Sequence, residues 1–151
     1  MRLRAEWLYS AGRKADIAFN DTDGKRRKFM SASKQDYPGF RKYMDLVFAY
    51  AGTWSLEREL KPAGIKSIAI GDVFIKGGFP GHAVLVADLV RNEATGDVRV
   101  LLLQSYMPAQ DIHVLKNPDS IDGTPWYALP EGTQLVTPEW TFDVSQIKRW
   151  P

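Results

Sequence analysis

His82 is the residue of this sequence best placed to do chemistry. It follows the glycine-rich segment 77–81 and stands at the start of an apolar run at residues 83–90. Glycines allow a backbone or a ligand to approach closely. An imidazole held at a strand end suits a general base, because its unperturbed pKa lies near neutrality. The competing interpretation is a structural histidine that is hydrogen-bonded within a tight turn.

Gln104 is the candidate partner of His82. The apolar runs 83–90 and 98–103 predict an antiparallel hairpin with its turn at residues 92–97, which brings the polar end of the second strand beside the histidine. A shift of one residue in register would place Ser105 on that face instead of Gln104. A polar residue that only ends the strand is the alternative.

These patterns give two sets of candidate site residues. The candidate catalytic residues are the base and its orienting group, His82 and Gln104. The candidate binding residues, whose aromatic and polar side chains would supply contact area, are Phe79, Ser105, Tyr106 and Gln110.

The composition argues against several other kinds of site. With no cysteine, the chain has no disulfide, no cysteine-ligated zinc and no cysteine nucleophile. No carboxylate stands at metal-ligand spacing from either histidine, so we expect no metal, and no motif indicates another cofactor. The segment 77–81 lacks the lysine and hydroxyl residue of a phosphate-binding loop. Glu139 has no acidic partner of the kind a glycosidase needs.

The charge of the chain is small overall and unevenly distributed. The net charge is +2, with +6 in residues 1–66 and −4 in residues 67–151. The basic run 25–28 could contact phosphates or anionic lipid, but such a run is typical of solvated surface, and we expect no nucleic-acid partner. No apolar stretch reaches the roughly 20 residues of a membrane span. The first residues lack a signal-peptide pattern, which predicts a cytoplasmic location for the chain as written.

Length and periodicity predict a single α+β domain. Its expected centre is the 83–90/98–105 hairpin of an antiparallel sheet, buried on both faces because both runs are continuously apolar, and packed against N-terminal helices. Residues 20–36 are expected to form a surface loop. The expected helices are 1–12, 40–51 and 55–60, and the other expected strands are 68–70, 73–75, 112–115, 126–129 and 135–137.

The first expected helix begins without a cap. Its apolar stripe is in phase from Met1, and no Ser, Thr, Asp or Asn precedes it to bind the free N–H groups of the first turn. We therefore expect that the chain is N-terminally shortened and that the upstream reading frame continues this helix. We also expect a cysteine within about two turns of Met1, where a helix N-terminus would lower the pKa of its thiol.

Five sequence blocks resemble an uncharacterised bacterial family, domain of unknown function 4846. They are residues 2–6, 71–75, 77–84, 104–111 and 137–140, and together they span nearly the whole chain. The resemblance implies a longer protein that continues upstream of Met1 and often carries an export signal. Such a precursor would be periplasmic or a lipoprotein.

The order of elements is also similar to that of papain-like cell-wall amidases and peptidases. In those enzymes a cysteine at the start of the first helix is activated by a histidine on a strand, which a third polar residue orients. The resemblance assigns the second and third of these roles to His82 and Gln104, and it places the cysteine upstream of Met1.

Three hypotheses for function follow. The first is a papain-like hydrolase domain for cell-wall peptide that lacks its nucleophile and is inactive as given. The second is a module that binds a peptide or glycan around Phe79, His82, Tyr106 and Gln110 without chemistry. The third is a purely structural or interaction domain.

Overall fold

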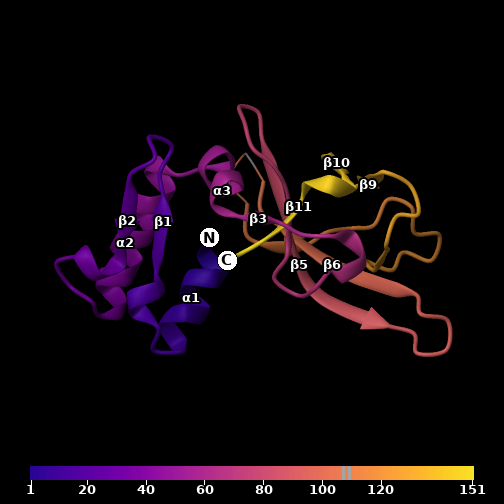
Figure 1. The fold of residues 1–151 in the computed structure, drawn as a ribbon, viewed down its shortest axis with the longest axis horizontal. Coiled ribbons are helices and arrows are strands. Elements are labelled where there is room, and N and C mark those ends of the chain that lie inside the picture. Colours follow the sequence, from indigo (N-terminus) through magenta and orange to yellow (C-terminus); the bar gives the residue numbers. More distant parts are fainter. Residues whose placement is uncertain (107, 109) are drawn as a thin grey trace. The chain divides into compact units, whose positions relative to one another are not determined.

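The fold is described for residues 1–106, 108 and 110–151 by a computed structural model. Its internal contacts divide the chain into two units, residues 1–59 and residues 60–151 (Figure 1). The candidate site residues all belong to the second unit.

The first unit combines three helices with a short hairpin. The elements are α1 (Arg2–Ser10), β1 (Ala18–Asn20), β2 (Arg26–Lys28), α2 (Tyr37–Tyr50) and α3 (Thr53–Glu59). The start of α2 is capped by Asp36, whose side chain accepts a hydrogen bond from the Gly39 amide at 2.8 Å. Its buried face, with Phe40, Met44 and Val47, has the spacing predicted from the sequence. All three expected helices are confirmed.

The expected loop at residues 20–36 is more ordered than predicted. β1 and β2 pair antiparallel, and a 3-10 helix follows at Phe29–Ser31. The buried Asp21 carboxylate closes the hairpin, because it accepts a hydrogen bond from the Lys25 amide at 2.7 Å and pairs with Arg27 at 2.9 Å. Polar composition suggested a plain loop, but local side-chain hydrogen bonds of an aspartate favour a turn between strands.

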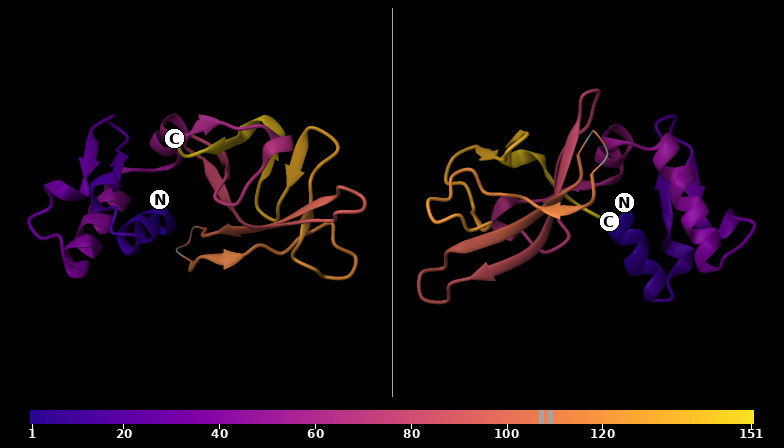
Figure 2. Two further views of the ribbon diagram at one scale, coloured as in Figure 1. Left: turned by 60° about the horizontal axis from the view of Figure 1, so that its bottom comes forward. Right: turned by 180° about the vertical axis from the view of Figure 1, so that it is seen from behind.

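The second unit contains a seven-stranded antiparallel sheet, in which β5 and β6 are the long inner strands, and a separate two-stranded sheet of β9 and β10 (Figures 1 and 2). The strand order is β3-β11-β4-β5-β6-β7, and β8 also pairs with β6. The α+β class with a central hairpin is therefore confirmed. The strands are β3 (Lys61–Pro62), β4 (Val73–Lys76), β5 (His82–Arg91), β6 (Val98–Gln104), β7 (His113–Val114), β8 (Tyr127–Ala128), β9 (Gln134–Val136), β10 (Thr141–Asp143) and β11 (Ile147–Arg149).

A β-bulge interrupts the pairing of β5 and β6. Near the turn, Leu89 pairs with Val100, but on the other side of the bulge Val86 pairs with Leu102. The register shift lies between Val86 and Asp88, so β5 contains one residue more than β6 at this point. Because side chains alternate between faces, this extra residue decides which side chains of the two strands share a face.

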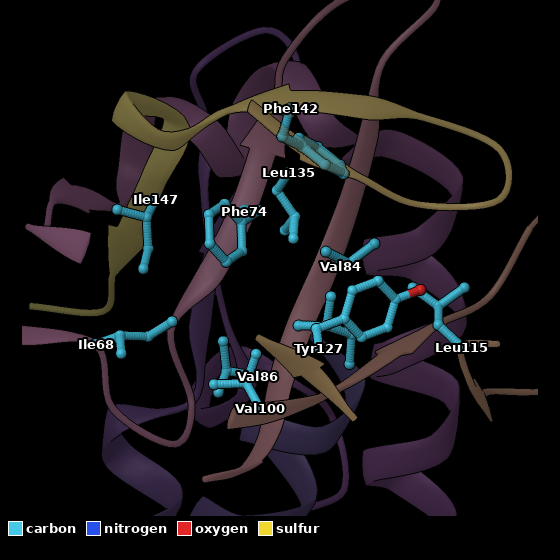
Figure 3. Packing of buried hydrophobic residues seen from close by; sticks show 11 residues of the cluster. Ile68, Phe74, Val84, Val86, Val100, Leu115, Tyr127, Leu135, Phe142 and Ile147 are labelled. Atoms are coloured by element: carbon cyan, nitrogen blue, oxygen red, sulfur yellow. The ribbon is translucent and has the colours of Figure 1, made fainter. Parts of the chain in front are cut away.

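The sheet buries one face more completely than the other. In the site half of β5, Val84 and Val86 are buried, whereas Ala83 and Leu85 are only half-buried. The prediction of burial on both faces is therefore wrong for these strands, since an unbroken apolar run conceals the alternation of a half-buried strand. The core on the buried face, drawn in Figure 3, consists of Ile68, Phe74, Val84, Val86, Val100, Leu102, Leu115, Tyr127, Leu135, Phe142 and Ile147.

β11 is held beside β4 by a buried carboxylate. Asp72 accepts two hydrogen bonds from Arg149, at 2.6 and 2.8 Å, in the two-pronged geometry that suits a guanidinium and a carboxylate. Asp72 also accepts a hydrogen bond from the Ala69 amide. The strand predicted at residues 68–70 is consequently a turn after a 3-10 helix at Ile65–Ser67, because the Asp72 carboxylate accepts from the amide of Ala69, three residues earlier.

Gly71 permits the turn that leads into β4. Its φ is +92°, and an added Cβ would meet no atom of the described residues within 4 Å, so the backbone conformation is what requires glycine. Gly71→Ala should lower the free energy of unfolding by about 1 to 2 kcal/mol, measured by urea denaturation. Gly52→Ala is the matched control, since Gly52 has equally open space and no positive φ. An equal effect at both positions would contradict this account.

Candidate functional site

His82 stands at the first residue of β5 and is 6% exposed. It pairs with Lys76 of β4, so the glycine-rich segment 77–81 is the loop that joins these two neighbouring strands. The sequence prediction that a glycine-rich turn delivers the histidine to the start of a central strand is confirmed. The loop itself is less buried, and Phe79 at its tip is 82% exposed.

Three aromatic rings surround the imidazole. The ring of Phe142 stacks on it with centroids 6.0 Å apart, Trp140 lies at 5.8 Å, and Tyr106 meets it edge-on at 5.2 Å. Edge-to-face and offset arrangements at such distances stabilise ring pairs. The ring of His82 is therefore held in one orientation by packing from β10, from the β9–β10 turn and from the end of β6.

Gln104 is the hydrogen-bond partner of His82. The imidazole Nε2 lies 2.6 Å from Gln104 Oε1, and both side chains are buried. The register of β5 and β6 on this side of the bulge pairs even-numbered residues with even-numbered ones, which puts Gln104 on the face of His82. Ser105, the alternative left open by the sequence, is exposed.

Glu139 extends this contact into a chain of three side chains. The amide nitrogen of Gln104 donates to Glu139 Oε2 at 2.7 Å. Glu139 lies in the turn between β9 and β10, which is closed by hydrogen bonds from the backbone N–H and the hydroxyl of Thr137 to the Trp140 carbonyl, at 2.9 and 2.6 Å. The same turn therefore positions both the carboxylate that binds Gln104 and the indole that contacts His82.

The carboxylate of Glu139 also influences Tyr127 in the core. Burial, and then the negative charges of Glu139 and Asp119, raise the pKa of Tyr127 to about 12. The raised pKa keeps the phenol protonated well into the alkaline range, and the phenol donates a hydrogen bond to the Lys116 carbonyl at 2.6 Å.

The hydrogen bonds define which imidazole nitrogen carries the proton. An ionised carboxylate can only accept, so the Gln104 NH₂ group faces Glu139 and the Gln104 carbonyl faces His82. His82 Nε2 must then be the donor, which leaves the lone pair of the neutral ring on Nδ1. Among the described residues, Nδ1 has no hydrogen-bond partner.

The remaining candidates are brought together only in part. Tyr106 contacts His82 directly, and Phe79 belongs to the loop that precedes it, whereas Gln110 is exposed and makes no described contact with the histidine. Sequence reasoning missed Glu139 and Trp140 as site residues. Their one signal was that residues 137–140 formed one of the blocks of family resemblance, although nothing in the sequence indicated their contact with β5 and β6.

Neither a cluster of metal-binding side chains nor a membrane-spanning helix is found among the described residues. In this part of the chain, no three His, Cys, Asp or Glu side chains are grouped so that they could hold a metal. None of the described helices is long and apolar enough to cross a bilayer.

Comparison with protein families decides the classification. The model of the domain of unknown function 4846 matches residues 30–149, and this range contains the whole His82–Gln104–Glu139 chain. The protein belongs to this family. Comparisons with curated proteins and with solved structures gave no match. The 4846 domain of this chain therefore includes α2, α3 and all of β4 to β11.

Proposed function

We propose that this 4846 domain carries the base and the orienting group of a papain-like hydrolase site for peptide or amide bonds of the cell wall. His82 is the proposed base and Gln104 its orienting group. The observation that supports this most directly is the 2.6 Å contact between His82 Nε2 and Gln104 Oε1, made by two buried side chains on neighbouring strands.

The geometry suits a base that serves a thiol. With Nε2 donating to Gln104, Nδ1 is the nitrogen that accepts a proton. In the proposed step a thiol S–H bond breaks and an Nδ1–H bond forms, giving a thiolate and an imidazolium. The Gln104 carbonyl stabilises this imidazolium because its hydrogen bond to Nε2–H becomes charge-assisted.

The nucleophile must come from outside these 151 residues, because the chain contains no cysteine. We propose that the active form is a longer protein whose cysteine stands at the start of the first helix, and that the chain as given does not hydrolyse its substrate. His82 is already engaged as the base and the amide of Gln104 is not nucleophilic, so neither replaces the thiol.

Reading the DNA upstream of the Met1 codon tests this proposal. We expect an open frame with a cysteine codon within about two helical turns of Met1. The longer protein should release peptides from cell-wall material, and His82→Ala should abolish this release. His113→Ala, at the other histidine, is the control. An open frame without a cysteine, or full activity of the His82 variant, would exclude a papain-like site.

A binding module without chemistry is the second candidate. The observation that favours it is Phe79, which is 82% exposed on the loop that leads to His82. An exposed aromatic ring offers a large contact area for a peptide or a sugar. Titration of the chain with soluble cell-wall peptides and glycans, followed by NMR, should then perturb Phe79, His82 and Tyr106 without turnover, and Phe79→Ala should weaken binding.

A further inference from the structure

The Gln104 side chain can lie in either of two orientations of nearly the same shape. In one orientation its carbonyl faces His82, and in the other its NH₂ group does. The first requires a proton on His82 Nε2, whereas the second requires Nε2 to accept and moves the proton of the neutral ring to Nδ1. Because Gln104 is 3% exposed, water has little opportunity to satisfy whichever end is left over.

Glu139 distinguishes between these two orientations. Its carboxylate accepts from the Gln104 amide nitrogen at 2.7 Å and cannot donate when ionised. A reversed amide would bring two acceptors, the Gln104 carbonyl and the Glu139 carboxylate, against each other. A hydrogen bond to an ionised group is also about twice as strong as one between neutral groups, so the preference is substantial.

We propose that Glu139 is a positioning residue that fixes the tautomer of His82 through Gln104. The carboxylate holds the amide, the amide carbonyl holds the proton on Nε2, and the lone pair is kept on Nδ1. The usefulness of this arrangement rests on the proposed function, in which Nδ1 takes the thiol proton, but the tautomer itself is a property of the chain as it stands.

The placement of Glu139 supports a specific role. Glu139 is exposed, and a solvated glutamate needs no partner. The turn that carries it is nevertheless closed by two hydrogen bonds from Thr137. This turn places the carboxylate against the buried amide of Gln104, 35 residues earlier in the chain. The next residue, Trp140, packs against the histidine ring itself. Two consecutive side chains of one turn thus act on the same imidazole, one directly and one through Gln104.

The tautomer can be measured by ¹⁵N NMR of the histidine rings at alkaline pH, where a histidine ring is neutral. In the native chain we expect His82 to carry its proton on Nε2. In Glu139→Gln, an isosteric side chain that both donates and accepts, both orientations of Gln104 become possible. The share of the Nδ1–H form relative to the Nε2–H form should then rise about tenfold, as loss of a charge-assisted hydrogen bond implies.

The chain contains its own controls. Glu131→Gln makes the same chemical change at an exposed glutamate and should leave the His82 spectrum unchanged. The second histidine, His113, is exposed and serves as an internal reference whose signals should be the same in all variants.

Each outcome supports or contradicts the positioning role of Glu139, separately from the hydrolase proposal. An Nδ1–H ring in the native chain would overturn the proposal without any variant, and so would an unchanged tautomer ratio in a folded Glu139→Gln protein. If the ratio shifts as expected but the longer protein hydrolyses nothing, the positioning role stands and the hydrolase proposal fails. If hydrolysis requires His82 while the ratio does not respond to Glu139, only the positioning role fails.

Discussion

Truncation of Val86 or Leu102 to alanine should lower the free energy of unfolding by about 2 to 4 kcal/mol in each case. Both side chains are 0% exposed, and the two residues face each other across β5 and β6 within the core of the second unit. Removing either leaves a cavity that a packed sheet cannot collapse to fill. Urea or thermal unfolding of the purified variants measures the loss.

Val90→Ala is the matched control for Val86→Ala. It makes the same substitution on the same strand, at a side chain that is 46% exposed, and should change stability by less than about 0.5 kcal/mol. Losses below about 1 kcal/mol at both Val86 and Leu102 would contradict the central position of the hairpin.

His82→Ala should lower the free energy of unfolding by more than about 2 kcal/mol. The ring is buried among three aromatic side chains and donates to a buried amide. Its removal leaves the Gln104 carbonyl without a donor, and a buried unpaired acceptor is unfavourable. Chemical denaturation followed by tryptophan fluorescence is a suitable measurement.

Two further variants make this prediction specific. His113→Ala, at an exposed histidine, should have little effect on unfolding. Gln104→Ala should destabilise the native chain but add less in the His82→Ala background, because the two side chains share one hydrogen bond. Strict additivity of the two losses would contradict a direct interaction between them.

Much of the fold could be predicted from periodicity. The helices α1, α2 and α3 and the strands β4, β5 and β6 all lie where apolar spacing placed them. β11 could not be predicted in this way, because Ile147–Arg149 is too short to show a period and is held in the sheet by the pairing of Arg149 with Asp72, 77 residues earlier. Contacts over such distances leave no local trace in a sequence.

Of the candidate site, only the two strands that carry His82 and Gln104 could be predicted from the sequence. A hairpin with its turn at residues 92–97 was enough to bring the polar end of β6 to His82, but not to choose between Gln104 and Ser105. That choice is made by the bulge in β5, and bulges depend on tertiary packing more than on residue type. Glu139 reaches the site from a separate hairpin, and neither its spacing nor its neighbours indicated the contact.

The extra residue of β5 also affects how sequences of the 4846 family should be aligned. Before the bulge, the core-facing residues of β5 are even-numbered, as Val84 and Val86 show, whereas after it Leu89 is the residue that packs against the core. A relative that lacked this one residue would need its gap at the bulge. A gap in the adjoining turn would match core-facing positions of one chain with outward-facing positions of the other in the part of β5 between the bulge and the turn.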